Sequence, residues 1–328
     1  MRGQPDILVL GGDGMLGHKI FQRLRASAVT VCTVRSDPPP RVDLLAGVDV
    51  IHGVDLMHLD RTAEWLAGLR PKFVINCAGI IKQRAQSGDA IPSFTINSLL
   101  PHCLAQWCAR WNGRLIHFST DCVFSGSRGG YREDDPSDAA DLYGRSKFLG
   151  EVDALNALTL RTSIIGRELA RHRSLLDWFL AQGFPRQNHG LVRGFRRVIY
   201  SGVTTNHLAE LVERIVLRHP DLSGLYQVVS APISKYDLLL AIRDAYRMDI
   251  EIAPDESEIS DRSMRGDKLR AAIGYQAPPW PELIAQLAED PTPYERWNDN
   301  ATPGRQENPD YRWHRLAGQD AGQAPAHR

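Results

Sequence analysis

Short apolar runs alternate with longer, mixed polar and apolar segments through the first 165 residues of the chain. The runs are rich in β-branched residues and predict strands, whereas the segments between them have helical patterns. We expect strands at Ile7–Leu10, Val29–Val34, Val48–His52, Phe73–Asn76, Leu115–Ser119 and Leu158–Ile164, and helices near residues 15–25, 60–69, 94–111 and 141–155. This alternation is typical of βαβ units and predicts an α/β fold with a doubly wound parallel sheet.

Beyond about residue 166 the alternation is less regular, with helices expected near residues 173–182, 205–218 and 234–247 and a strand at Leu225–Val229. We therefore predict a first domain over residues 1–165, to which residues 200–230 return, and a smaller mixed α/β C-terminal lobe over residues 166–290. Residues 291–328 contain prolines at 291, 293, 303 and 309 and few aliphatic residues, which predicts a peripheral tail.

The charge balance excludes several classes of protein, because 39 Lys and Arg residues offset 39 Asp and Glu residues. A neutral chain has no general attraction to nucleic acid or anionic lipid, so we expect neither as a partner. The sequence contains neither a membrane-length apolar segment nor a signal-peptide pattern, which favours a cytoplasmic protein. The five cysteines lack Cys-x-x-Cys spacing and the eleven histidines are scattered, so we expect reduced thiols and no bound metal.

Three glycines spaced three residues apart, Gly11, Gly14 and Gly17, follow the first expected strand and precede a helix. Such a turn lets the backbone approach a pyrophosphate, while the helix N-terminus faces the anion. A glycine triplet alone is weak evidence, but its strand and helix context favours a Rossmann-type NAD(P)-binding domain over an ordinary glycine-rich loop. We expect Met15 and Leu16, inside the turn, to contact the cofactor as well.

The end of the second strand should select the cofactor, because an acidic residue there would bind the ribose 2′-hydroxyl of NAD. Arg35 and Ser36 occupy this position, and an arginine suits the 2′-phosphate of NADP, so NADP(H) is favoured over NAD(H). Asp37 is close enough to act as the acid instead, and Arg35 could equally be a solvated loop residue. Other strand ends should supply the remaining cofactor contacts, from Asp55, Leu56, Cys77, Ala78 and Gly79.

Tyr143 and Lys147 are four residues apart in an expected helix, which places a phenol and an ammonium on one face. About 0.2 such pairs are expected by chance at this composition, so the pair favours chemistry over a surface contact. Upstream, Ser119 and Thr120 place hydroxyls at the carboxyl end of the strand that begins at Leu115. Polar turn residues that merely cap the strand are the alternative interpretation.

In combination these residues resemble the extended short-chain dehydrogenase/reductase superfamily, and within it the dTDP-4-dehydrorhamnose reductase family of sugar-nucleotide ketoreductases. The matching segments occur in order: GGDGMLG at 11–17, NCAG at 76–79, STDCVFSG at 119–126, YGRSKFLGE at 143–151 and RTSIIG at 161–166. Asn97, Tyr131 and Glu133 match as single residues. Later matches are shorter, at residues 202–210, 224–226, 233–236 and 261–263.

The resemblance implies a role for each matching polar residue. Tyr143 would protonate the alkoxide that forms as hydride reaches a ketone carbon, and Lys147 would stabilise the phenolate and bind the nicotinamide ribose. Thr120 would hold the carbonyl oxygen together with Tyr143. Asn97 would organise a proton-relay water or, equally, be structural, and Arg262 would bind the substrate diphosphate or form a surface ion pair.

Several positions depart from the family pattern near the expected sugar. Cys122 follows Thr120 and Asp121, where reductases of the family have an aromatic residue and 4,6-dehydratases have an acid, so a dehydratase is disfavoured. Ser125 and Ser263 replace an acid and a proline, and the run Ile80-Ile81-Lys82-Gln83 is atypical. The residues expected to contact the substrate are Lys82, Asn97, Asp121, Cys122 and Arg262.

The sequence thus favours an NADPH-dependent reductase of a 4-keto-6-deoxy sugar nucleotide, with a dTDP-linked sugar preferred, in deoxysugar biosynthesis. One alternative is a non-catalytic, NADP-binding regulatory subunit of the methionine adenosyltransferase type, which would keep the fold and the cofactor site. Another is a nucleotide-sugar epimerase, which would hold NAD tightly through a full cycle. A homodimer is compatible with each of these functions.

Overall fold

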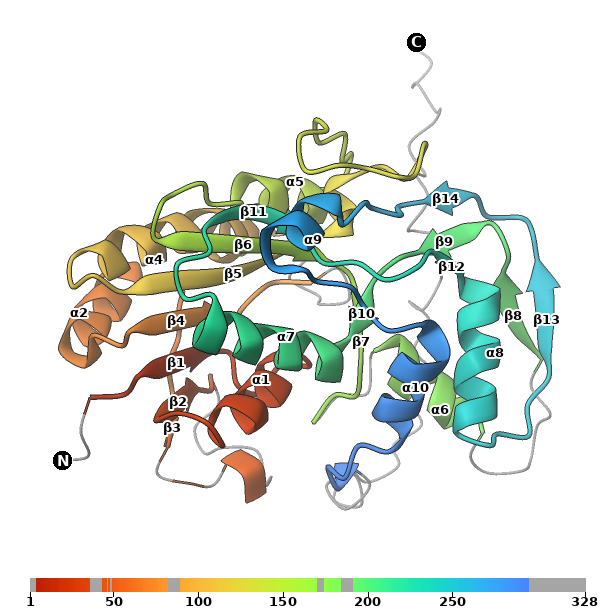
Figure 1. Ribbon diagram of the computed structural model, residues 1–328, viewed down its shortest axis with the longest axis horizontal. Helices are drawn as coiled ribbons and strands as arrows, with labels where there is room; N and C mark the ends of the chain where they lie inside the picture. The colour runs from red at the N-terminus through yellow and green to blue at the C-terminus, as the bar shows by residue number, and fades with distance from the viewer. Residues whose placement is uncertain are drawn as a thin grey trace, which may run out of the picture.

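A seven-stranded parallel sheet forms the centre of the molecule (Figure 1). The computed structural model describes residues 4–35, 43–45, 47, 49–81, 89–169, 174–183 and 191–294. The strands lie in the order β11-β6-β5-β4-β1-β2-β3, and each neighbouring pair is parallel. They are β1 (Ile7–Leu10), β2 (Thr30–Thr33), β3 (Val50–Ile51), β4 (Phe73–Asn76), β5 (Arg114–Thr120), β6 (Ala157–Thr162) and β11 (Gly224–Gln227). The predicted doubly wound α/β fold is confirmed.

The strand order reverses between β1 and β4, and this reversal positions the site. From β1 the chain moves outward through β2 to β3, then returns to β4 and proceeds through β5 and β6 in the opposite direction. Loops that leave the carboxyl ends of β1 and β4 therefore diverge and open a crevice between them. The glycine turn follows β1, and Cys77–Gly79 follows β4, so both predicted cofactor segments border this crevice.

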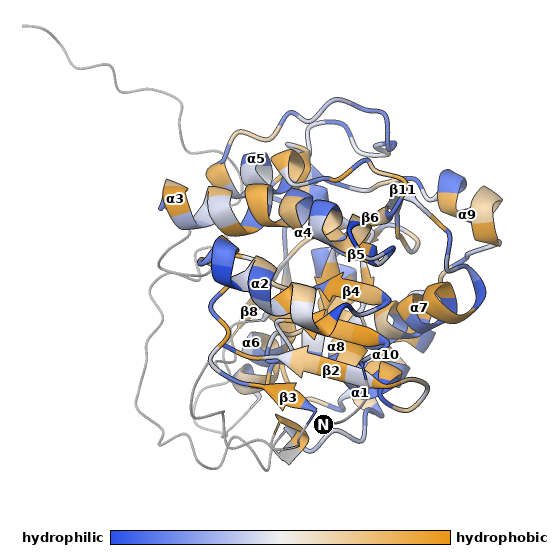
Figure 2. Cartoon of the chain, turned by 90° about the vertical axis from the view of Figure 1, so that its left-hand side faces the viewer, coloured by the Kyte–Doolittle hydropathy of each residue, from blue (hydrophilic) through white to orange (hydrophobic). Residues whose placement is uncertain are grey.

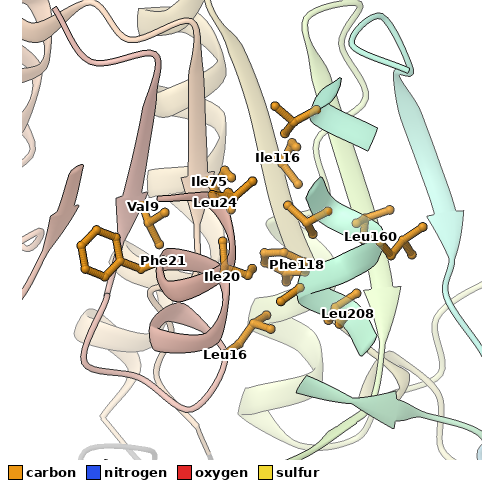
Figure 3. Packing of buried hydrophobic residues seen from close by; sticks show 14 of the residues in the cluster. Val9, Leu16, Ile20, Phe21, Leu24, Ile75, Ile116, Phe118, Leu160 and Leu208 are labelled. Atoms are coloured by element: carbon orange, nitrogen blue, oxygen red, sulfur yellow. The ribbon is translucent and has the colours of Figure 1, made fainter. Parts of the chain in front are cut away.

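Helices cover both faces of the sheet (Figure 2). On one face α1 (Gly17–Leu24) packs against α7 (Thr205–Arg218), and on the other lie α2 (Leu59–Leu69), α4 (Leu100–Ala109) and α5 (Leu142–Leu149). Because side chains alternate along a strand, Ile7 and Val9 join the core beneath α1, shown in Figure 3, while Leu8 and Leu10 join the core beneath α2 and α4. A strand with apolar residues on both faces belongs in the interior of a parallel sheet.

The second lobe combines helices with short strand pairs and has a core of its own. Its helices are α6 (Leu175–Gln182), α8 (Lys235–Ala245) and α10 (Trp280–Ala288), whereas α9 (Asp267–Ile273) packs on β11 and joins the core beneath α1. The strand pairs are β7 (Ile164–Ile165) with β10 (Val203–Thr204), β9 (Val198–Tyr200) with β12 (Ile233–Ser234) and β14 (Ser260–Asp261), and β8 (Val192–Phe195) with β13 (Ile252–Asp255). The lobe's core includes Phe179, Leu238, Ile242 and Leu283. Most of these strands were not predicted, since they are too short to show an alternating pattern.

Several predicted elements differ from the structure by one or two residues at their ends, and three others show larger or structurally informative differences. The helix expected over 141–155 ends at Leu149, with Gly150 as its C-cap, and a Cβ at this position would lie 1.8 Å from the Asn97 carbonyl oxygen. The helix expected over 94–111 starts earlier, as α3 (Ala90–Ser93), and continues through a π-helical segment, Phe94–Leu99, into α4. The strand expected to end at Ile164 breaks at Ser163, after which β7 pairs with β10 of the second lobe.

The segment Asp290–Tyr294, which follows α10, packs on α1, the helix that begins at the glycine turn. Lys19 Nζ lies 2.8 Å from an Asp290 carboxylate oxygen, and the Tyr294 hydroxyl lies 2.8 Å from His18 Nε2. Residues 295–328 of the expected tail lie outside the described residues. Within the described part of the chain, every helix is too short or too polar to span a bilayer.

Candidate active site

A pocket of about 410 Å³ lies at the carboxyl edge of the large sheet, between the sheet and the second lobe. The glycine turn and the ends of β4 and β5 form one wall, and residues of β9, α8 and β14 form the opposite wall. Twelve of the residues singled out from the sequence line it: Gly14, Met15, Leu16, Cys77, Ala78, Gly79, Thr120, Asp121, Cys122, Tyr143, Lys147 and Arg262. The structure therefore brings the predicted cofactor turn and the predicted proton donors into one cavity.

The glycine turn depends on glycine at its first and last positions. Gly11 has a φ of +77°, a conformation that favours glycine, and its amide is 3.2 Å from the Thr33 hydroxyl oxygen. A Cβ at position 17 would lie 2.0 Å from the Gly11 carbonyl oxygen, so α1 can approach the turn this closely only without a side chain there. The resulting backbone cradle at the start of α1 fits the pyrophosphate of a dinucleotide.

The remaining predicted cofactor residues have different surroundings. Arg35 is exposed just after β2 and does not line the pocket, and Asp55 is exposed after β3, where its carboxylate accepts from the Met57 amide at 3.1 Å. Leu56 is buried in the core beneath α2. Ser36 and Lys82 lie outside the described residues.

Tyr143 and Thr120 meet because α5 packs tightly on the turn after β5. A Cβ on Gly144 would lie 2.2 Å from the Cys122 carbonyl oxygen, so glycine at this position permits the contact. The Asp141 carboxylate caps the helix by accepting from the Gly144 amide at 2.9 Å. Thr120 and Tyr143 form a side-chain hydrogen bond in this arrangement. Burial, with a smaller contribution from Cys122, raises the pKa of Tyr143 well above its ordinary value, which keeps the phenol protonated at neutral pH.

Lys147 lies one turn further along α5, and its ammonium is buried beneath the pocket. Its Nζ donates to the Phe118 carbonyl oxygen at 2.5 Å. Burial lowers the pKa of Lys147 to about 8, and the nearby carboxylate of Glu151 and the thiol of Cys77 oppose this shift. The side chain is therefore a cation near neutral pH, held at the end of β5 beside the cofactor segment Cys77–Gly79.

A buried ion pair that the sequence reasoning missed lies behind Lys147. Arg161 on β6 donates twice to Glu151, from Nε at 2.8 Å and from an Nη at 2.7 Å, and only 1% of its side chain is exposed. The Ser119 hydroxyl donates to the same carboxylate at 2.6 Å. Both charged residues stand within the matching segments YGRSKFLGE and RTSIIG, but the sequence gives no sign that the two segments meet.

The Asn97 side chain forms hydrogen bonds with the protein's own backbone and side chains. Its side-chain oxygen accepts from the Ile80 amide at 2.9 Å, and its nitrogen donates to the Ile80 carbonyl at 3.0 Å and to the Ser146 hydroxyl at 3.1 Å. It is buried and is not among the residues that line the pocket. Of the two roles left open by the sequence, this geometry supports the structural one: Asn97 ties the π-helical segment to α5 and to the loop after β4.

The second lobe contributes cations to the far end of the pocket. Arg262 donates from Nε to the Phe124 carbonyl oxygen at 2.9 Å, which directs its guanidinium along the pocket wall. Lys235 and Tyr200 also line this end, and neither was singled out as a site residue from the sequence. The only signal was the short match at 233–236, because a lysine at the start of a helix has no distinctive pattern. Among the described residues, no cluster of His, Cys, Asp or Glu could hold a metal ion.

A family model described as the RmlD substrate binding domain matches residues 5–291, which is most of the chain. The chain belongs to this family. The match starts two residues before β1 and ends shortly after α10, so the RmlD family domain includes both the sheet that forms the glycine turn and the lobe that supplies Lys235 and Arg262.

Individual relatives are similar over different lengths. A dTDP-4-dehydrorhamnose reductase of Streptomyces griseus is 33% identical over 158 residues, covering 47% of this chain and 46% of that protein, or about half of each. Methionine adenosyltransferase 2 subunit beta of Xenopus tropicalis is 24% identical over 253 residues, covering 74% of this chain and 72% of that protein. The crystal structure of dTDP-4-dehydrorhamnose reductase from Bacillus anthracis in complex with NADP aligns with a TM-score of 0.71 at 19% identity, covering 87% of this chain and 99% of that one. The last likeness concerns the fold.

Proposed function

We propose that this protein is an NADPH-dependent reductase that converts a 4-keto-6-deoxy sugar nucleotide, with a dTDP-linked sugar favoured, to the corresponding 6-deoxyhexose. The observation that carries this proposal is the pair of Tyr143, which is half-buried, and Thr120, which is buried, hydrogen-bonded to each other in a pocket that begins at a glycine turn. The name of the Streptomyces griseus relative, dTDP-4-dehydrorhamnose reductase, supports the substrate class.

The cofactor would lie along the glycine turn and the end of β4. Gly11, Gly14 and Gly17 form a cradle that fits a pyrophosphate, and Cys77–Gly79 borders the pocket where the nicotinamide half would extend toward Tyr143. When bound, the reduced nicotinamide supplies the hydride to the ketone carbon. Arg35, exposed at the end of β2, favours NADPH through its charge, because a guanidinium can bind a 2′-phosphate with two hydrogen bonds.

Tyr143 would donate the proton to the substrate oxygen. Since burial holds the phenol in its protonated form, it is ready to give a proton to an alkoxide as charge develops there. Thr120 would donate a second hydrogen bond to the same oxygen. Lys147, a buried cation one helical turn away, would stabilise the phenolate that remains and hydrogen-bond the nicotinamide ribose.

The substrate would lie between the end of β5 and the second lobe, with Asp121 and Cys122 near the sugar and Arg262 near the diphosphate. In this arrangement residues 1–165 together with 200–230 bind the cofactor, and residues 166–290 bind the sugar nucleotide. We also propose that the enzyme acts in the cytoplasm, where NADPH and sugar nucleotides are available, and that it can form a homodimer.

The test is to mix the purified protein with NADPH and dTDP-4-keto-6-deoxyglucose, with and without a 3,5-epimerase, and to follow the nicotinamide absorbance band. We expect NADPH oxidation, and we expect Tyr143→Phe to lower turnover by about 100-fold or more while NADPH affinity changes little. Lack of oxidation with a panel of keto sugar nucleotides would refute the proposal. Unchanged turnover by Tyr143→Phe would remove this residue from the mechanism.

A regulatory subunit is the second candidate, favoured by the similarity to methionine adenosyltransferase 2 subunit beta over 74% of the chain. In that case the pocket would bind NADP without turnover, and the protein would associate with a synthetase subunit. Co-purification of such a subunit, together with inactivity toward every keto sugar nucleotide, would decide for this candidate.

A further inference from the structure

Lys235 enters the pocket from the second lobe and has an unusual environment for a lysine. Its Nζ lies 3.9 Å from the centroid of the Tyr200 ring, and the Tyr200 side chain is buried. An ammonium carries three hydrogen-bond donors, and a ring face satisfies them only through a cation–π interaction. Within the described ranges of the chain, the Lys235 ammonium has no oxygen partner for these donors.

The other described lysines provide a contrast, because each has an oxygen partner. Lys19 contacts Asp290 at 2.8 Å, Lys72 contacts Asp6 at 2.8 Å, Lys147 donates to Phe118 and Lys268 donates to Leu225. Lys268 also lies over a tyrosine ring, that of Tyr226, yet it still reaches a carbonyl oxygen at 2.7 Å. A lysine on a tyrosine therefore does not by itself exclude an oxygen partner, and of the two described lysines that line the pocket, Lys147 has an oxygen partner within the described part of the protein and Lys235 does not.

The charges around Lys235 place it beside the proton-donating residues. Burial lowers its pKa to about 8, Asp121 and Cys122 oppose this shift, and Arg262 adds to it, so the side chain is a cation near pH 7. Asp121 follows Thr120 directly, and Asp121 and Cys122 also act on the pKa of Tyr143. Lys235 and Tyr143 thus both line the pocket, and the same two residues, Asp121 and Cys122, lie close enough to act on the pKa of each.

Asp121 offsets part of the charge of Lys235, but the hydrogen-bond donors of a partly enclosed ammonium stay unsatisfied unless a ligand supplies an acceptor. We propose that Lys235 donates a hydrogen bond to an oxygen on the sugar ring, on the carbon next to the reacting carbonyl. This inference rests on the proposed function and names a specificity residue for it. In a 4-keto-6-deoxy hexose, carbon 5 carries the methyl group and its only oxygen is the ring oxygen, a weak acceptor because it belongs to the acetal at carbon 1, so the hydroxyl next to the ketone is the 3-hydroxyl. The enzyme would then select keto sugars that retain an oxygen at carbon 3.

The experiment measures kcat/KM for two substrates that differ only at carbon 3: a dTDP-4-keto-6-deoxy sugar with the 3-hydroxyl and its 3-deoxy analogue. A hydrogen bond from a charged donor corresponds to about 10- to 100-fold, so the wild-type protein should prefer the 3-hydroxy substrate by this factor. Lys235→Met keeps the alkyl stem over Tyr200 and removes the donors. It should lose about 10- to 100-fold on the 3-hydroxy substrate and almost nothing on the 3-deoxy analogue.

Two further variants distinguish the loss of 3-hydroxyl recognition from a general loss of activity. Lys235→Arg keeps the charge and the donors and should restore part of the preference for the 3-hydroxy substrate. Lys268→Met removes a lysine over a tyrosine outside the pocket and should leave the kcat/KM of both substrates unchanged. NADPH affinity, which depends on the opposite wall, should be unchanged in all three variants.

Binding of dTDP, which lacks the sugar, shows whether Lys235 contacts the sugar or the diphosphate of the substrate. If Lys235→Met weakens dTDP binding as strongly as it lowers kcat/KM, the lysine contacts the diphosphate and the inference is overturned. An equal loss on the 3-hydroxy and 3-deoxy substrates would also overturn it, while leaving the proposed function intact. Absence of turnover by the wild-type protein would instead refute the proposed function, and this inference with it.

Discussion

Glu151 controls the charge state of Lys147 through a buried carboxylate. The carboxylate holds the pKa of Lys147 higher than burial alone would set it, and Arg161 fixes the carboxylate with two hydrogen bonds. Cys77 and His117 also face Lys147, but burial raises the pKa of the thiol and lowers that of the imidazole, so both are neutral near pH 7. Glu151 is therefore the charged side chain through which the protein keeps this ammonium protonated.

We expect Glu151→Gln to move the alkaline limb of the pH profile of kcat/KM toward lower pH. Without the carboxylate the pKa of Lys147, already near 8, falls further, so the ammonium is lost earlier as pH rises. The activity relative to wild type should be about three- to tenfold lower at pH 8.5 than at pH 6.5. Asp153→Asn, a change of an exposed acid two residues away, should leave the profile unchanged. A purely structural defect in Glu151→Gln would lower activity equally at all pH values and contradict this role.

The start of α1 lies very close to the turn that follows β1, and this close approach forms the expected cofactor site. A side chain at position 17 would meet only backbone atoms, the Gly11 carbonyl group and Gly12 Cα, none of which can rotate away. Gly17→Ala should therefore push α1 from the turn, lower the free energy of unfolding by about 1–3 kcal/mol and weaken NADPH binding by at least about tenfold. Thermal unfolding and an NADPH fluorescence titration measure the two effects.

Gly68 provides the matched control for this prediction. It lies in α2, is exposed, and has no atom within 4 Å of the position where a Cβ would be. Gly68→Ala should stabilise the protein by about 0.5–1 kcal/mol, since alanine is the better helix former, without changing NADPH affinity. Wild-type NADPH affinity in Gly17→Ala would show that the pyrophosphate is bound elsewhere.

The large sheet could be predicted from the sequence, and the second lobe only in part. β1 is wholly apolar and β4 is apolar up to its last residue, Asn76, and turn residues follow both strands, so their predicted ends were correct. Strands such as β7 and β12 have two residues each and exist because a partner from a distant segment pairs with them. The same holds for the site: Thr120, Tyr143 and Lys147 lie in recognisable segments, whereas Lys235 is recognised only once the fold places it in the pocket.

At the scale of the whole molecule, the segment after α10 connects the second lobe to the glycine turn. The Gly14 carbonyl can only accept a hydrogen bond, so His18 Nδ1, 2.9 Å away, carries the proton of the imidazole. Burial lowers the pKa of His18 to about 4, which makes the ring neutral, and its Nε2 must then accept from the Tyr294 hydroxyl. Tyr294 thus supports the cofactor turn through a single histidine, and Asp290 fixes the segment to Lys19 beside it.

The pair between Lys19 and Asp290 should therefore contribute to the stability of the whole molecule. The exposed fractions of the two side chains are 10% and 3%. Asp290→Asn leaves a nearly buried ammonium without its counter-charge and should lower the free energy of unfolding by about 3 kcal/mol at pH 7. Asp244→Asn, which removes an ion pair whose carboxylate is 66% exposed, should change it by less than about 1 kcal/mol. Denaturant unfolding monitored by tryptophan fluorescence compares the two variants with the wild type.

The difference in the free energy of unfolding between wild type and Asp290→Asn can also be measured as a function of pH. Its pH dependence tests whether the charge on Asp290 causes this difference. Burial alone would raise the pKa of Asp290, but the hydrogen bond and charge of Lys19, with Thr292, hold it below its ordinary value of 3.8. A carboxyl group with a lower pKa in the folded state stabilises the protein above its unfolded pKa, and this contribution disappears as pH falls through the folded value. The difference between wild type and Asp290→Asn should therefore be constant from pH 5 to pH 7 and shrink below about pH 4. A difference that stays constant down to pH 3 would mean that packing around Tyr294, rather than the charge on Asp290, fastens this segment to α1.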